Sequence, residues 1–425
     1  MQGFIIFLSL VSILVAIYFL SRSRCVSTSI HMIIWQVLIL MYFILYNQKM
    51  SSFFGILYLE NICIFALMGE LLGEKIRFRV NGDNTLSSGD LRDNFLYRIL
   101  FIFIIIGIFS DVMTVISNGF SLSAFTSMSS FLQMNAKMAD IRYSGAGESG
   151  GVMMSLLGLF IYAAPLLGGF IFLYSKNKSQ KLTSILSIFP ALLATMITNA
   201  KMGFIAATFL WIVGFVAAHI CKGDVKDLFA PKRIIITLLF VVIFFLILFL
   251  SFCFRYGSFD SNTIEMVKMK MTVYGLGQIQ AFSVWISDFY PHNMDVAFGK
   301  YTFIGITSKL GLVNRIQGMY ELIPGVDTNV FTAYRAIVTD FGLLGGLAAM
   351  FLTGFISGTS FSTFKENGNI LFLTIWCSIF YFFLYSFATS VWTYTSFVLV
   401  FTVFFIILLI NKNRIKSFVL TNKIC

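Results

Sequence analysis

The sequence predicts an all-α, polytopic membrane helix bundle with about eleven transmembrane helices. Of its 425 residues, 58% are hydrophobic and only 12% are charged, about half the charged fraction of an ordinary soluble domain. The apolar residues stand in long runs, and about 20 such residues cross the hydrocarbon core as a helix. The run 234–253 is apolar on every side, whereas a barrel strand alternates apolar and polar residues. A soluble domain and a β-barrel are therefore disfavoured.

Eleven apolar runs separated by polar breaks define the expected spans. They lie near residues 3–20, 32–46, 52–72, 96–117, 151–174, 182–197, 203–220, 234–253, 337–358, 370–388 and 394–410. The second and sixth runs are the shortest, which is typical of tilted or re-entrant segments. The first run lacks a basic region before it and a small-residue cleavage signature after it, so we expect a retained span rather than a signal peptide.

The distribution of Lys and Arg predicts the orientation in the membrane. Most of the 30 basic residues fall in the loops 21–31, 73–95, 175–181, 221–233 and 359–369 and in the C-terminal tail. Short cytoplasmic loops carry an excess of Lys and Arg, so these segments are expected inside. We therefore predict a periplasmic N-terminus and a cytoplasmic C-terminus in a bacterial inner membrane. Because the positive charge flanks the spans, nucleic acid is disfavoured as a partner.

Three regions follow from this topology. Residues 1–253 hold helices 1–8 and an outer loop at 117–150, residues 254–336 form a large periplasmic loop, and residues 337–425 hold helices 9–11 with a cytoplasmic tail. Long outer loops usually carry function. Within the large loop, residues 265–286 mix apolar and polar positions, which indicates a helix along the membrane surface.

No nucleotide, metal or hydrolase motif is present in the sequence. The chain lacks a P-loop, an HExxH motif, a GxSxG motif and a CxxC pair. We therefore predict no metal and no cofactor. Carboxylates inside predicted spans, Glu60 and Asp111, are expected to face a bundle interior or a polar cavity.

The most informative segment is GVDTNVFTAYRAIVTDFGLLGG, residues 325–346, where an outer loop enters the ninth span. If this segment is helical from Asn329 onward, one polar face gathers Asn329, Thr332, Arg335, Thr339 and Asp340. Such a face can bind sugar hydroxyls or a diphosphate, with the Arg335 guanidinium as a forked donor to phosphate. The structural alternative is an Arg335–Asp340 interaction or a solvated helix cap.

The order of Asn329, Thr332, Asp340, Phe341, Gly342 and Gly345 resembles the N-x-x-T…D-F-G-x-x-G segment of the O-antigen polymerase (Wzy) family of oligosaccharide repeat-unit polymerases. The segment YGLGQIQAF, residues 274–282, resembles the family's amphipathic segment in the same loop. The resemblance implies a GT-C-type polymerase/ligase architecture. It also implies transfer of a growing glycan from undecaprenyl diphosphate to another lipid-linked repeat unit at the periplasmic face.

The resemblance also suggests which residues act. Arg335, Asp340 and Arg142 are the predicted catalytic residues, with Asp340 as a candidate base for the acceptor hydroxyl. The predicted substrate-binding residues are Lys201, Arg255, Arg315, Asn329, Thr332 and Tyr334. Lys201 stands where many family members have an arginine-bearing turn, and the alternative for each isolated basic residue is a membrane-interface anchor. Expected partners are the bilayer, the undecaprenyl-diphosphate-linked glycan, a chain-length regulator of the Wzz type and a flippase of the Wzx type.

Two other functions stay open on the sequence. An O-antigen ligase shares the many-helix plan and depends on a loop histidine, for which His292 in YPHNM is the candidate, without a matching ligase motif. A lipid-linked oligosaccharide flippase or secondary transporter is also helical and basic, but is expected to carry Lys or Arg inside its spans, and these are nearly absent here.

Overall fold

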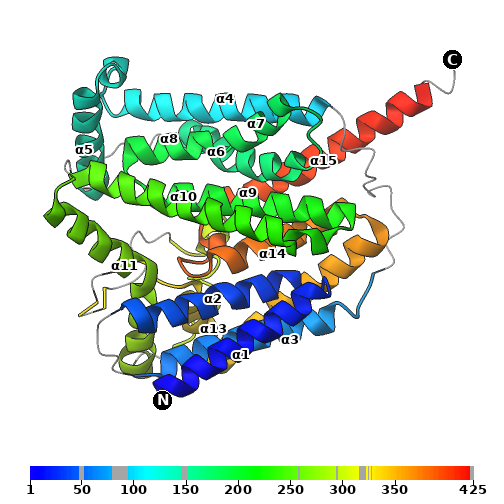
Figure 1. Cartoon of the computed structure of the whole chain (residues 1–425). Helices are drawn as coiled ribbons and strands as arrows, with labels where there is room; N and C mark the ends of the chain where they lie inside the picture. The colour runs from blue at the N-terminus through cyan, green and yellow to red at the C-terminus, as the bar shows by residue number, and fades with distance from the viewer. Residues whose placement is uncertain are drawn as a thin grey trace. The chain divides into compact units, whose positions relative to one another are not determined.

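The computed structural model describes residues 1–46, 52–78, 94–144, 151–256, 259–292, 295–314, 322–323, 325–326 and 328–421. Regular structure in these ranges is helical, and they contain no β-strand (Figure 1). The prediction of an all-α chain is confirmed.

Apolar helices occupy all eleven predicted positions. They are α1 (Gln2–Ser21), α2 (Val26–Leu45), α3 (Phe54–Gly73), α4 (Asn94–Ser117), α6 (Gly151–Phe172), α7 (Lys178–Leu186) with α8 (Phe189–Thr198), α9 (Lys201–Lys222), α10 (Pro231–Tyr256), α13 (Ala333–Asn367), α14 (Ile370–Tyr385) and α15 (Thr395–Thr421). Within the described residues, ten segments are long and apolar enough to cross a bilayer, and α14 is a shorter eleventh helix. The chain is therefore a multi-pass membrane protein.

The structure differs from the prediction in the outer segments and in the sixth span. The expected outer loop 117–150 contains a 3₁₀ turn (Leu122–Phe125) and α5 (Met128–Ser144). In the expected large loop, the helix predicted at residues 265–286 is present as α11 (Ser261–Val284), whereas the short α12 (Ile304–Thr307) was not predicted. The sixth span is broken between α7 and α8, where Pro190 occupies the first turn of α8 and fits because the first turn needs no N–H donor.

The chain forms two compact units, each assembled from two stretches of sequence. Unit 1 comprises Met1–Gly82 and Lys268–Val398, and unit 2 comprises Asp83–Val267 and Leu399–Cys425. These units divide the chain differently from the three predicted regions, because unit 1 joins the first three helices to α13 and α14.

In unit 1, α3 and α13 pack with their backbones in contact. A Cβ atom added to Gly69 would lie 2.0 Å from the Phe351 carbonyl oxygen, and one added to Gly354 would lie 2.0 Å from the Ala66 carbonyl oxygen. Gly73 and Gly358 repeat this arrangement one turn later. Each helix thus carries a Gly-x-x-x-Gly pair, which permits the close approach that membrane helices use instead of a hydrophobic driving force.

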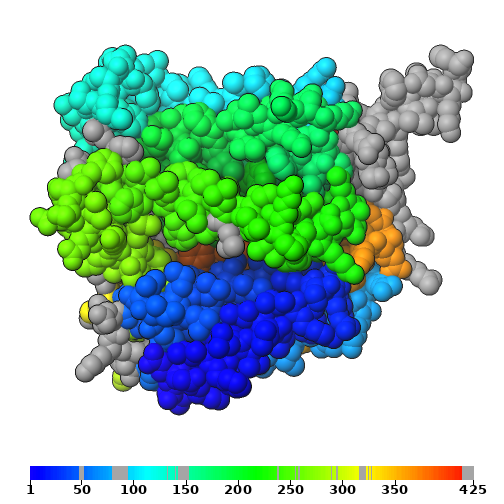
Figure 2. Space-filling view, in the orientation of Figure 1, coloured from blue at the N-terminus to red at the C-terminus, as the bar shows by residue number. Residues whose placement is uncertain are grey.

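The outer faces of both units present large apolar side chains. On α1, Phe4, Phe7 and Leu14 are more than half exposed, and on α10 Ile235 and Val242 are more than half exposed. In Figure 2, the surface of α1 is dark blue and that of α10 is green. Such faces are typical of helices whose solvent is the lipid hydrocarbon.

In unit 2, α6 lies between α4 and α9 and forms the centre of the packing. Helix α5 covers the neighbouring ends of α4 and α8, where Met134 and Met138 contact Val115 and Ile197 in a buried apolar cluster. The segment predicted as a loop is thus a docked helix that fixes the turn between α8 and α9.

Candidate functional site

The entrance of α13 in unit 1 is the first candidate site, because four of the predicted site residues lie in or just before the first turns of this helix. Helix α13 begins at Ala333, with Thr332 as the residue that precedes its first turn. The helical face predicted from Asn329 onward therefore starts later than expected, and Asn329 lies exposed before the helix. Thr332, Tyr334, Arg335 and Asp340 are all buried.

The Arg335 side chain lies against two aromatic rings. Its guanidinium carbon is 4.7 Å from the centroid of Phe331 and 5.3 Å from the centroid of Trp285. Only 7% of the residue is exposed. Contacts of this kind contribute about 0.5–2 kcal/mol each and hold the guanidinium plane in place. They also exclude water, which strengthens any interaction between the arginine and an anion.

Helix α13 is interrupted at Gly342, whose φ of 73° and ψ of 178° are non-helical. This combination is open essentially only to glycine. The interruption exposes two carbonyl groups to a neighbouring loop: the Ala297 N–H donates to the Thr339 oxygen at 3.2 Å, and the Phe298 N–H donates to the Asp340 oxygen at 3.0 Å.

The Asp340 side chain completes the docking of that loop. Its Oδ1 accepts the backbone N–H of Tyr301 at 3.0 Å, and its Oδ2 accepts that of Thr302 at 2.6 Å. Asp340 is fully buried. The Asp and Gly of the D-F-G motif thus share one structural task, which is to attach the loop 297–302 to the start of α13.

Tyr334 points into the protein interior rather than toward the surface of the entrance. Its hydroxyl is hydrogen-bonded to Nε2 of His31 and lies 3.2 Å from the Ser386 hydroxyl, which also accepts from Nε1 of Trp35 at 3.0 Å. The Ser386 carbonyl accepts the Ala333 N–H at 2.8 Å. This buried network ties the first turn of α13 to α2 and to the end of α14.

Lys201 marks a second candidate site, in unit 2. Its Nζ donates to Oδ1 of Asn199 at 2.5 Å and lies 4.2 Å from the centroid of Phe252. The Asn199 amide donates to Oδ1 of Asn135 on α5 at 3.1 Å. The turn between α8 and α9 therefore presents a cation that is bound by Asn199, and Asn135 in turn holds Asn199.

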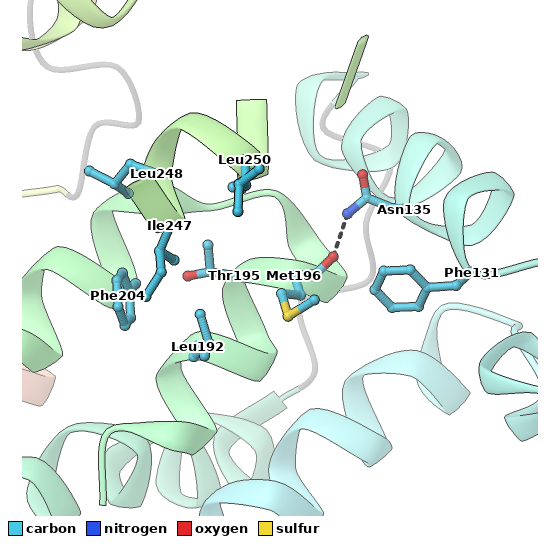
Figure 3. Close-up of a pocket in the computed structure, with 10 residues that line it drawn as sticks. Phe131, Asn135, Leu192, Thr195, Met196, Phe204, Ile247, Leu248 and Leu250 are labelled. Atoms are coloured by element: carbon cyan, nitrogen blue, oxygen red, sulfur yellow. Dashed lines mark hydrogen bonds between the residues drawn. The ribbon is translucent and has the colours of Figure 1, made fainter. Parts of the chain in front are cut away.

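An apolar pocket of about 210 Å³ lies beside this turn. Figure 3 shows Asn135 donating to the Met196 carbonyl at its edge. The lining comes from α5, α8, α9 and α10 and consists of Phe131, Asn135, Leu192, Thr195, Met196, Phe204, Ile247, Leu248, Leu250 and Ser251. An engineered cavity of roughly 150 Å³ takes up benzene, so this pocket has room for a short stretch of hydrocarbon chain.

The structure gives less information about the remaining predicted residues. Arg255 is exposed in the last turn of α10, three residues after Phe252. Arg142 lies on α5, but its side chain is outside the described residues, as is the whole of Arg315. Thr332 is buried, and its hydroxyl has no hydrogen-bond partner in the described ranges.

No family model, curated protein or solved structure matches this chain. Within the part of the chain that the structure describes, no three His, Cys, Asp or Glu side chains are grouped as metal ligands. The sites that the structure offers are therefore the Arg335 entrance in unit 1 and the Lys201 turn with its pocket in unit 2.

Several residues of these sites were not predicted from the sequence as site residues. Phe331 precedes Arg335 by four positions, a spacing at which neighbouring side chains meet at a helix start. Asn199 is two residues from Lys201 and has a left-handed backbone, which asparagine tolerates well. Trp285 and Asn135 come from distant segments, and nothing in the local sequence links them to their partners.

Proposed function

We propose that the protein is a glycosyltransferase that polymerises oligosaccharide repeat units carried on undecaprenyl diphosphate, at the periplasmic face of a bacterial inner membrane. The observation that carries the proposal is the buried Arg335 guanidinium between Phe331 and Trp285, at the start of a membrane-spanning helix. The multi-pass fold supports it, because a lipid-linked substrate is reached from within the bilayer.

The proposed reaction forms a bond between a hydroxyl oxygen of the acceptor repeat unit and the anomeric carbon of the donor glycan. The bond between that carbon and the diphosphate oxygen breaks, and the diphosphate leaves with the bonding electrons. Arg335 stabilises the charge that accumulates on the diphosphate, and the loss of one such donor typically lowers a rate by about 10²–10³. The departing diphosphate accepts the hydroxyl proton.

Asp340 takes a positioning role in this proposal. Its two oxygens already accept the N–H groups of Tyr301 and Thr302, so its carboxylate is directed at the loop 297–302. By attaching that loop to α13, it shapes the surroundings of Arg335. Asn329, which is exposed just before the helix, is the residue best placed to hydrogen-bond a sugar.

Unit 2 supplies features that suit the lipid part of the substrate. The pocket beside the α8–α9 turn is almost entirely apolar, which fits an isoprenoid chain. Lys201 beside it and the exposed Arg255 suit a phosphate. We therefore propose both as phosphate-binding residues of unit 2, a role that the family resemblance implies for them.

The test is genetic and uses the length of the surface glycan as its readout. A strain that lacks the gene is complemented with the wild type, Arg335→Ala or Arg22→Ala, and glycan ladders are compared on gels at matched protein abundance. Arg22 is the control, because it is an exposed arginine that lies over the Tyr18 ring, 4.6 Å from the ring centroid. We expect long glycans with the wild type and the control, and single repeat units with Arg335→Ala.

Two results would overturn the proposal. Full-length ladders from Arg335→Ala at normal abundance would remove this residue from the site. Bare lipid core from the deletion strain, without single repeat units, would instead indicate a ligase. Purified protein in vesicles, supplied with lipid-linked repeat units on the accessible face, separates a polymerase from a flippase, since only a polymerase elongates them.

A further inference from the structure

Glu60 is a carboxylate in the membrane-spanning part of unit 1. It lies seven residues into α3, about 10 Å from the start of the helix, and only 1% of the residue is exposed. Its Oε1 accepts from the Ser9 hydroxyl of α1 at 3.1 Å, and its Oε2 accepts from Nε2 of Gln36 of α2 at 2.7 Å. Three spans therefore converge on one acidic group near the middle of α1 and α2.

The neighbouring buried carboxylate, Glu70, has a different environment. It accepts from the Thr28 N–H at 2.8 Å, from the Thr28 hydroxyl, and from the hydroxyls of Ser27 at 2.8 Å and Ser357 at 3.3 Å. It also lies at the N-terminus of α2, where the helix dipole favours negative charge. Four donors and a helix end offset part of the cost of burying a charge on Glu70, whereas Glu60 has two neutral donors and no helix end.

No basic side chain compensates Glu60. Helices α1, α2 and α3 contain no Lys or Arg, and no ion pair in the described part of the chain includes Glu60. Besides Glu60, the titratable and charged groups on α1, α2, α3 and α13, on α14, and on the turn Trp285–Phe289 that packs on α3 are Tyr18, His31, Tyr42, Tyr58, Cys63, Glu70, Asp288, Tyr334, Arg335, Asp340, Lys365, Glu366, Cys377, Tyr381 and Tyr385. None of them is hydrogen-bonded to Glu60, which accepts from Ser9 and Gln36 among the described residues.

We propose that Glu60 is a proton-binding site in the transmembrane bundle of α1, α2 and α3. A bare carboxylate in this position lacks the compensation that a buried charge requires, so binding a proton is the favourable state. Either neighbour can accept the proton in a hydrogen bond: Ser9 through its hydroxyl oxygen, and Gln36 through Oε1. That Oε1 atom is buried and has no partner in the described residues, and Gln36 is fully buried.

The site is separate from the proposed polymerase reaction and does not depend on it. Its consequence is mechanical, because removing the proton creates a charge where α1, α2 and α3 meet. Water or a cation must then enter between these helices to stabilise that charge. Proton occupancy is thereby coupled to how tightly α1 and α2 pack on α3.

Dicyclohexylcarbodiimide provides the test, since this apolar reagent modifies protonated carboxyl groups within membranes. The full-length protein in its native membrane is labelled across a pH series, and the modified residue is identified by mass spectrometry. We expect labelling at Glu60 that falls as the pH rises, drops to background in Glu60→Gln, and is unchanged in Glu70→Gln. Glu60→Gln is nearly isosteric with the protonated acid, so it is expected to fold.

Three outcomes would overturn the proposal. The first is the absence of Glu60 labelling at every pH while a carboxylate introduced at the exposed, lipid-facing Leu14 by Leu14→Glu is labelled. The second is labelling of Glu70 in place of Glu60. The third is full protection of Glu60 by sodium ions at constant pH, which would make the site a metal-cation site instead. Glycan length in the same Glu60→Gln strain reports on the polymerase separately, so failure of one proposal leaves the other distinguishable.

Discussion

Replacing Asp340 with asparagine distinguishes a positioning role, in which the residue holds the loop 297–302, from the role of a catalytic base. The substitution keeps the shape of the side chain but leaves only one acceptor oxygen for the N–H groups of Tyr301 and Thr302. The other N–H then faces the amide NH₂ group, which is also a donor. A positioning residue should therefore lose stability on this change, whereas a catalytic base should lose only activity.

The expected loss follows from the two hydrogen bonds. A hydrogen bond to a charged group contributes about 1.5–3 kcal/mol, and a buried donor left without a partner costs about 1–3 kcal/mol. Because the loop 297–302 can relax, we expect a decrease of about 3 kcal/mol in the free energy of unfolding, near the lower end of the combined range. Domain stabilities of about 5–15 kcal/mol make this a large effect.

The measurement is an unfolding titration of the purified protein in mixed micelles, combined with the glycan ladder of the same variant. Thr339→Ala is the matched control, because the Thr339 hydroxyl bonds only to the Arg335 carbonyl of its own helix, at 2.8 Å. We expect the control to change stability by less than about 1 kcal/mol. An Asp340→Asn protein with wild-type stability and no glycan polymer would refute the positioning role and support the base predicted from the sequence.

Four further outcomes test other parts of the structure. Arg335→Lys keeps the charge but loses the planar group between Phe331 and Trp285, so glycan ladders should shorten strongly at unchanged protein abundance. Gly342→Ala should lower the free energy of unfolding by about 1–3 kcal/mol, since alanine rarely adopts its φ of 73°. Asn135→Ala removes the bonds to Met196 and Asn199, and limited proteolysis should then cut α5 faster. An impermeant maleimide added to intact spheroplasts should label the variant Phe298→Cys, because this residue is 85% exposed and is predicted to be periplasmic. It should not label Arg77→Cys, which is predicted to be cytoplasmic. The reverse labelling pattern would invert the predicted topology.

The positions of the spanning helices were predictable because each needs an apolar run of its own, which is a local property. The sixth span shows the limit of predicting helices from apolar runs alone. Its break falls just before Pro190, and proline in a first helical turn is a recognised start signal, so the interruption was visible in the sequence. The Gly-x-x-x-Gly pairs of α3 and α13 are also a local pattern, but they did not indicate that these two helices pack on each other, which only the structure shows.

Helices α5 and α11 were harder to predict as docked structure. Neither has a continuous apolar face of the length that marks a span, and α5 is held by contacts with segments that lie far away in the chain. Met134 and Met138 contact Val115 and Ile197, and a sequence pattern gives no indication of which distant residues will cover such positions.

The candidate site was predictable only at its centre. The motif spacing located the segment from Asn329 to Gly345, and four of the five site residues predicted in it are buried in or just before the first turns of α13. The partners of Asp340 stand 38 and 39 residues earlier in the chain, in a loop without a motif. The motif identified the residues. The role of Asp340 in attaching the loop 297–302 to α13 is shown only by these long-range hydrogen bonds.

Helix α3 contacts α13 on the far side of the Gly342 interruption from Arg335. The Tyr58 hydroxyl of α3 donates to the Leu343 carbonyl at 2.7 Å, just beyond Gly342. Deeper in the bundle, Gly69 and Gly354 hold α3 and α13 in backbone contact. Separating the two helices at Gly69 would therefore tilt the part of α13 that follows Gly342 about its contact with Tyr58. Because the non-helical Gly342 separates that part from the turns that carry Arg335, whose ring contacts are Phe331 and Trp285, we expect a larger side chain at Gly69 to lower stability more than it displaces Arg335.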